Sequence, residues 1–178
     1  IDNVTIFNED ILKWDFNEIG LADHSEIQVI GNLPYNITSP VIEKLIKNRG
    51  IISRAILMFQ KEVANRLTAS PRKKEYGALT VLLRYYALSR PLINVQRKSF
   101  YPVPKVDSVV LELDFKKPYV NHTINEVEFK KVVKAAFSHR RKTLLNSLAG
   151  FSRGWDRRLV LAALTASGIE PSRRAETL

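Results

Sequence analysis

The sequence predicts an α/β fold for residues 1–116 and a small helical domain for residues 117–178. Up to about residue 116, short apolar runs alternate with helix-like and turn-like segments, which is typical of α/β proteins. Beyond that point, apolar residues recur at helical spacing instead. The 178-residue length and the 45% hydrophobic content allow both parts to bury a core.

Five apolar runs are predicted to be strands of one sheet. They are residues 4–7, 27–31, 54–60, 91–98 and 108–115. In the last run, apolar residues at positions 109, 111 and 113 alternate with Glu112 and Asp114, as in a strand with one buried face. Two prolines in the segment SFYPVPKVD favour an extended loop before this strand.

Helices are predicted after several of these strands. Ser39 is the expected N-cap of a helix that has Pro40 at its first position, just beyond the second run. Further helices are predicted at 61–69 and 78–88, on either side of a basic loop at 70–77. A helix that starts directly after a strand lies at the edge of the sheet where α/β proteins bind ligands.

The second part is predicted to be helical throughout. Residues 116–123 form an expected linker, and apolar side chains from Phe129 to Phe137 then recur on one face, opposite lysines. Two more helices, at 141–150 and 156–168, each end in a glycine, which favours the left-handed backbone of a helix C-terminus.

The charge is uneven along the chain. Residues 1–89 contain 11 Lys and Arg against 10 Asp and Glu, whereas residues 90–178 contain 17 against 8. An excess of this kind favours a polyanion as partner, because neutralised phosphates release their counterions. No apolar run approaches the ~18 residues of a membrane span, and no signal-peptide pattern opens the sequence. We therefore expect a cytoplasmic protein that does not associate with membranes.

A metal site is not expected. The sequence has no cysteine, and its three histidines (His24, His122 and His139) are far apart and lack the spacing of ligand pairs.

The segment Asn32-Leu33-Pro34-Tyr35 follows a predicted strand directly, and it is the clearest chemical motif. The exocyclic amine of adenine is a weak nucleophile because its lone pair is delocalised into the ring. Two oxygen acceptors, the Asn32 side chain and a nearby backbone carbonyl, can bind both amine hydrogens and orient the nitrogen toward a methyl donor. Pro34 stiffens the turn, and Tyr35 offers a face for stacking an extruded base. A simple strand-ending turn is the alternative interpretation.

A second aromatic residue supports the first interpretation. The loop FYPVPK places Phe100 beside a rigid turn and Lys105, as expected for a second stacking wall with a phosphate contact. On its own, Phe100 would be interpreted as a core residue.

Five segments resemble one family, the KsgA-type ribosomal RNA adenine dimethyltransferases, and occur in the family's order. They are GNLPYNITSPVIEKLI, QKEVANRL, EYGALTVLLRYYA, SFYPVPKVDSVVLELDF and AAFSHRRKTLLNSL. The resemblance implies a Rossmann-like class I methyltransferase fold, incomplete at the N-terminus, with a small C-terminal helical domain. It also implies S-adenosylmethionine as methyl donor, no metal, and dimethylation of two adjacent adenosines in small-subunit (16S) ribosomal RNA during ribosome biogenesis.

The resemblance also implies roles for particular residues. Asp10, Ile11 and Asn32 would contact the cofactor, with Asp10 at its adenine amine. Leu33 would join Asn32 as an acceptor for the target amine, and the side chains at positions 35 and 100 would hold the target base between them. Without the resemblance, Asp10 would be interpreted as a loop acid or a helix cap.

Seven basic residues are expected to contact RNA phosphates. They are Arg72, Lys73, Lys74, Lys105, Arg140, Arg141 and Lys142. A solvated helix face is the alternative for most of them. The expected partner is small-subunit ribosomal RNA within a pre-ribosomal particle, with no obligate protein partner.

Two other functions compete with the methyltransferase. A non-catalytic RNA-binding or ribosome-assembly protein could have the same fold, although the intact Asn32-to-Tyr35 motif favours catalysis. DNA adenine methyltransferases typically have proline in place of Leu33, so they resemble the chain less.

One departure from the family leads to a further expectation. The family's glycine-rich cofactor loop would precede residue 4, and the seven glycines here never form a G-x-G pair. We expect a truncated version of a longer protein, which binds S-adenosylmethionine at least tenfold more weakly and is inactive. We also expect the sheet edge at 4–7 or 27–31 to be bare or covered by another chain.

Overall fold

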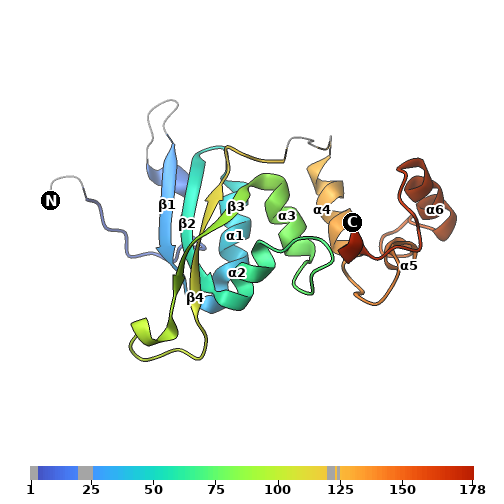
Figure 1. Ribbon diagram of the computed structural model, residues 1–178. Coiled ribbons are helices and arrows are strands. Elements are labelled where there is room, and N and C mark those ends of the chain that lie inside the picture. The colour runs from blue at the N-terminus through green and yellow to red at the C-terminus, as the bar shows by residue number, and fades with distance from the viewer. Residues whose placement is uncertain (1–3, 20–25, 120–122, 124) are drawn as a thin grey trace.

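A computed structural model describes residues 4–19, 26–119, 123 and 125–178. Four strands form one mixed sheet in the order β1-β2-β4-β3 (Figure 1). They are β1 (Ile27–Asn32), β2 (Ile52–Gln60), β3 (Leu88–Val95) and β4 (Ser108–Asp114). β1 and β2 are parallel, whereas β4 is antiparallel to both of its neighbours. These strands confirm four of the five predicted ones, within three residues at each end.

Six helices accompany the sheet in the described residues. They are α1 (Thr38–Lys47), α2 (Lys61–Leu67), α3 (Ala78–Tyr86), α4 (Glu126–Ala136), α5 (Leu144–Leu148) and α6 (Arg157–Ala166). Figure 1 shows α1, α2 and α3 against one face of the sheet, with α4, α5 and α6 farther along the molecule. None of the helices in this part of the chain is long and apolar enough to cross a membrane.

The strand predicted at residues 4–7 is wrong. This segment is described but belongs to no strand, and its side chains are exposed, with Ile6 at 88%. An apolar run becomes a strand only where a neighbouring strand accepts its backbone hydrogen bonds. Within the described residues, the sheet ends at β1 on this side.

The cap predicted for α1 is also wrong. The helix begins at Thr38, one residue before Ser39, and Ile37 at the N-cap position makes no side-chain capping bond. A 3₁₀ turn at Tyr35–Ile37 leads directly into the helix, and the Thr38 hydroxyl donates to the Tyr35 carbonyl at 3.2 Å. This backbone turn replaces the side-chain cap.

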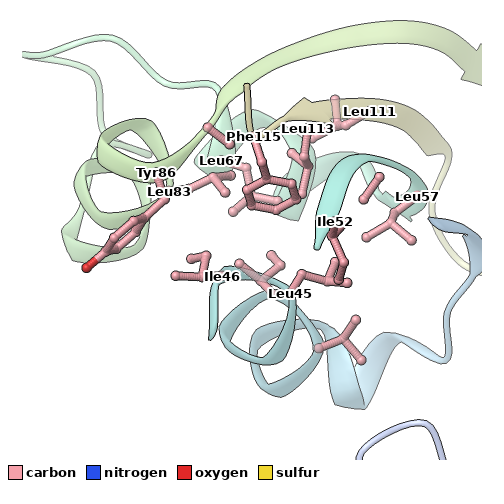
Figure 2. Packing of buried hydrophobic residues seen from close by; sticks show 14 of the residues in the cluster. Leu45, Ile46, Ile52, Leu57, Leu67, Leu83, Tyr86, Leu111, Leu113 and Phe115 are labelled. Atoms are coloured by element: carbon pink, nitrogen blue, oxygen red, sulfur yellow. The ribbon is translucent and has the colours of Figure 1, made fainter. Parts of the chain in front are cut away.

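The main core lies between the sheet and its three helices (Figure 2). Leu57 of β2 and Leu111 of β4 are opposite each other in the register, and both are buried against α1, which contributes Leu45. Leu83 and Tyr86 extend the same cluster into α3. Apolar residues at alternate strand positions thus produce one buried sheet face, as the sequence pattern predicted.

A second, smaller core joins α4, α5 and α6. The Asp156 side chain caps α6 by accepting from the backbone amides of Arg158 and Leu159. Gly168 ends this helix with a positive φ of 68°, and the following amide of Ile169 donates to the Leu164 carbonyl at 2.9 Å. This is the left-handed helix ending that the glycine predicted. The helix predicted at 141–150 is shorter, because it spans only α5.

Helix α4 connects the two cores. Phe129 packs against the main cluster, whereas Ala135, later in the same helix, belongs to the second. The linker prediction at 116–123 and the histidines at 24 and 122 fall partly or wholly outside the described residues. The division into domains near residue 116 therefore stays a prediction.

Candidate active site

Three loops emerge at one edge of the sheet. The strand register aligns Asn32, at the end of β1, with Met58 near the end of β2. It also aligns Gln60, at the end of β2, with Ser108 at the start of β4, and Ser108 with Val95 at the end of β3. The turn after Asn32, the start of α2 and the loop 96–107 therefore share this edge, which lies at the bottom of the sheet in Figure 1.

The Asn32 side chain is exposed, and it makes no hydrogen bond within the described residues. It is held in place from both sides. Leu33 is partly buried against the main core, and Gly31 leaves little space, since a Cβ there would lie 3.1 Å from Leu57 Cδ2. A rigid backbone thus presents a free amide at the end of a strand.

Tyr35 connects this turn to the loop that precedes β4. Its hydroxyl lies 3.0 Å from the Ser108 Oγ, and Ser108 is only 1% exposed. The Ile37 amide donates to the Pro34 carbonyl at 3.2 Å and closes the turn around Tyr35. The hydrogen bond to a buried hydroxyl fixes the direction of the aromatic ring. Ser108 was not predicted from the sequence.

The loop 96–107 is anchored at both ends. The Asp107 side chain accepts from the Arg97 amide at 3.0 Å, and the Asp107 carbonyl accepts from the Lys61 amide at 2.9 Å. Phe100 is partly exposed, whereas Tyr101 is fully exposed. The structure thus brings Phe100 to the same sheet edge as the Tyr35 turn. The two rings make no direct contact with each other in the described part of the chain.

Lys105 lies in the same loop and is exposed. It lines a shallow hollow of about 590 Å³ together with Arg97, Lys61 and Asn65. The predicted phosphate contact of Lys105 is therefore placed beside the predicted stacking residue.

Asp10 and Ile11 lie in a different loop. Asp10 is exposed, and one of its carboxylate oxygens accepts from the Leu12 amide at 2.9 Å. Ile11 packs partly against the main core. The Lys44 ammonium of α1 donates to the carbonyls of Leu12 and Trp14, which attaches this loop to the helix that follows the Asn32 turn. The hydrogen bonds of the described residues connect Asp10 to α1 rather than to Asn32 itself.

Six of the predicted RNA-contacting residues are brought together by folding. The Arg140 guanidinium donates to the Lys74 carbonyl, and the Tyr76 and Phe137 rings lie 5.9 Å apart. The loop 70–77 therefore lies beside the loop 138–143. All six cations are exposed, and none has an ion-pair partner in the described residues. Arg72 has a positive φ of 70°.

A polar cluster joins α1, α3 and α4 away from this edge. Glu126 accepts from the Tyr86 hydroxyl at 3.0 Å and from Arg49 at 2.7 Å, and the Arg49 guanidinium lies 4.8 Å from the Tyr86 ring centre. Burial, followed by this hydrogen bond, raises the pKa of Tyr86 well above its usual value. Burial also raises the pKa of Tyr76, against the opposing effect of Arg84.

Within the described residues, no group of three or more carboxylate, imidazole or thiol side chains is placed to hold a metal ion. The chemistry available at the sheet edge is therefore that of an amide, backbone carbonyls, aromatic rings and cations.

Comparison with known proteins points to one family. Residues 2–170 match the family model described as "Ribosomal RNA adenine dimethylase". The ribosomal RNA small subunit methyltransferase A of Desulforapulum autotrophicum is 44% identical over 178 residues, which cover the whole chain and 62% of that protein. The chain thus spans less than two thirds of the length of this curated relative.

Two solved structures have the same fold. A dimethyladenosine transferase from Plasmodium falciparum superposes with a TM-score of 0.74 at 28% identity, over 97% of this chain and 66% of that one. The 23S rRNA methyltransferase ErmE superposes with a TM-score of 0.64 at 25% identity, over 96% of this chain and 65% of that one.

Proposed function

The chain belongs to the ribosomal RNA adenine dimethylase family, and we propose that it transfers methyl groups to the N6 amines of two adjacent adenosines in small-subunit ribosomal RNA. The observation that carries the proposal is the free Asn32 amide on a rigid turn, with the Tyr35 ring fixed beside it. The substrate would be RNA within a pre-ribosomal particle, so the cytoplasm, where bacterial ribosomes assemble, is the proposed site of action.

The Asn32 turn supplies the acceptors for the reacting amine. In this proposal the Asn32 side-chain oxygen accepts one amine hydrogen, and the Leu33 backbone carbonyl accepts the other. These bonds favour a pyramidal nitrogen whose lone pair points at the methyl group. Pro34 has no amide hydrogen, which keeps the turn open to an incoming base.

Two aromatic rings would hold the extruded adenine. Tyr35 is oriented by Ser108, and Phe100 reaches the same sheet edge from the anchored loop. Stacking on both faces of the base would offset part of the free energy of unstacking it from its RNA neighbours.

S-adenosylmethionine would supply the electrophilic methyl group when bound. The Asp10 loop fits its adenine end, because one carboxylate oxygen of Asp10 stays without a hydrogen bond in the described residues and Ile11 offers partly exposed apolar surface. Asn32 would border the cofactor on its other side. The residues that would hold the methionine end are not identified in this chain.

The six exposed loop cations, together with Lys105, would hold the RNA backbone. Their charges are not neutralised by acidic partners in the described residues, so each can release a counterion from a phosphate.

The experiment is methyl transfer by the longest open reading frame that contains the chain. Small-subunit ribosomal RNA particles that lack the modification are incubated with the protein and methyl donor, and N6,N6-dimethyladenosine is measured by mass spectrometry. We expect Asn32→Ala to lower turnover by about 10²-fold or more, with little change in RNA affinity. Near parental turnover of the variant would refute the role of Asn32. RNA binding by the parent without any methyl transfer would favour the non-catalytic alternative.

A further inference from the structure

We propose that a basic cleft along α1 is a second RNA-binding surface, which holds the backbone of a strand that leads away from the Asn32 turn. The proposal rests on RNA as the substrate, and it adds a surface that the motif residues do not include. The cleft lies between the segment 12–17 and the helices α1, α3 and α4, and its volume is about 820 Å³.

The cleft follows α1 along its length. Pro40, in the first turn of the helix, lines one end, and Asn48, just after the last turn, lines the other. At 1.5 Å per residue, this wall is about 12 Å long. The first turn of α1 comes directly after Tyr35, so a strand in the cleft would run from the proposed catalytic turn toward the opposite edge of the sheet.

The charge of the cleft is positive. Its charged lining residues are Lys13, Lys44, Lys47, Lys130 and Lys134, against Asp15 and Glu43. The ammonium of Lys44 is occupied by two backbone carbonyls, and that of Lys130 lies 5.2 Å from the Tyr86 ring centre. Lys13, Lys47 and Lys134 are exposed and have no ion-pair partner within the described residues.

These three unpaired cations come from three different elements. Lys13 lies in the segment beside α1, Lys47 is in the last turn of α1, and Lys134 is in the last turn of α4. Folding therefore collects them around a concave surface, whereas a solvated helix face would spread like charges along one helix. A concave surface with one dominant sign of charge concentrates polyanions. A phosphodiester backbone is the polyanion that the proposed function supplies.

Trp14 forms part of the wall and provides a direct reporter. It is partly exposed, and its ring is held by Phe7 and Phe16, with ring centres 5.5 and 5.2 Å away. The chain contains only 2 tryptophans. In a Trp155→Phe background, emission therefore reports on Trp14 alone.

The first measurement is the salt dependence of RNA binding by the longest open reading frame that contains the chain. A fluorescently labelled single-stranded RNA of about 16 nucleotides is titrated between about 50 and 200 mM KCl. The variant Lys47→Gln/Lys134→Gln is compared with Lys116→Gln/Lys117→Gln. The control lysines are equally exposed, but they pair with Glu26 at 2.7 Å and with Asp114 at 3.8 Å, outside the cleft.

The cleft variant should reduce the log–log slope by about 1.4, which is roughly 0.7 for each single-strand phosphate contact, and the control should keep the parental slope. RNA should also quench Trp14 emission in the Trp155→Phe protein, and this quenching should disappear in the cleft variant. An unchanged slope together with unchanged Trp14 emission would overturn the proposal. Quenching by poly-glutamate but not by RNA would also overturn it, and would assign the cleft to an acidic protein.

The binding assay needs no methyl donor, so its outcome is separate from that of the proposed function. A parent protein that methylates no RNA would refute the enzyme but not the cleft. If the parent methylates RNA, the cleft variant should raise KM more than it lowers kcat, because the cleft lies away from the reacting amine.

Discussion

The hydrogen bond between Tyr35 and Ser108 allows a quantitative test of how the site is built. Tyr35→Phe removes the hydroxyl and keeps the ring, whereas Tyr35→Ala removes both. Ser108→Ala removes the other partner. The two oxygens are 3.0 Å apart, and Ser108 is 1% exposed, so water cannot easily replace the missing partner.

The expected free-energy changes follow from this burial. Leaving a buried hydroxyl without its partner costs about 1–3 kcal/mol, whereas the net contribution of one such bond is about 0.5–1.5 kcal/mol. We therefore expect Tyr35→Phe to lower the free energy of unfolding by about 1–2 kcal/mol. Tyr35→Phe/Ser108→Ala should cost less than the sum of the single changes by about 1 kcal/mol, because both partners are then absent.

Activity should separate the ring from the hydroxyl. Stacking of one base on an aromatic side chain is worth about 1–3 kcal/mol, which corresponds to about 5–150-fold in affinity. Tyr35→Ala should therefore weaken both RNA affinity and turnover. Tyr35→Phe keeps the stacking face, and we expect turnover to fall by less than about tenfold.

Urea unfolding of the parent, the two single variants and the double variant gives the coupling free energy. Methyl-transfer kinetics of the same proteins, with Tyr35→Ala added, give the contribution of the ring. A coupling free energy near zero would show that the hydrogen bond does not form in solution. Equal loss of turnover in Tyr35→Phe and Tyr35→Ala would refute the stacking role.

Three further predictions concern other parts of the molecule. Neutralising the six cations at 72–74 and 140–142 should lower the log–log salt slope of RNA binding by about 0.7–0.9 for each phosphate that the protein no longer neutralises, and an unchanged slope would leave them as a solvated surface. Glu112→Ala removes a buried carboxylate that pairs with two arginines, which are themselves partly exposed; urea unfolding should show a loss of about 1–2 kcal/mol, and no loss would contradict this contribution. The raised pKa of Tyr86 means that its stabilisation is complete below the usual value of 10.0 and falls at higher pH, so Tyr86→Phe should reduce the alkaline loss of stability measured by thermal unfolding, and an identical pH profile would contradict it.

The sequence predicted the elements that depend on local pattern. The strand at 108–115 was clear because its alternation matches a half-buried sheet, and the glycine at 168 marked the end of α6. The run at 4–7 has the same apolar character, but it is not a strand, because strand formation depends on a neighbour. Local sequence contains no information on whether that neighbour is present.

The contacts that build the site could not be predicted in the same way. Tyr35 and Ser108 are separated by 73 positions in the chain, and Arg140 and Lys74 by 66. Serine at the start of a strand and arginine in a basic run have no pattern that identifies a distant partner. The motif thus predicted which residues gather at the sheet edge, whereas the contacts that fix Tyr35 became apparent only in the folded chain.

Helix α1 shows how one element can connect several parts of the site. Its N-terminal turn continues from the Asn32 motif, and Lys44 in its middle donates to the carbonyls of Leu12 and Trp14. Because these carbonyls flank the Asp10 loop, a shift of α1 would move the proposed cofactor contact and the proposed catalytic turn together. The same helix also forms one wall of the basic cleft. RNA bound in the cleft would therefore contact the element that sets the geometry of the Asn32 turn, which gives binding outside the catalytic turn a direct physical route to the reacting amine.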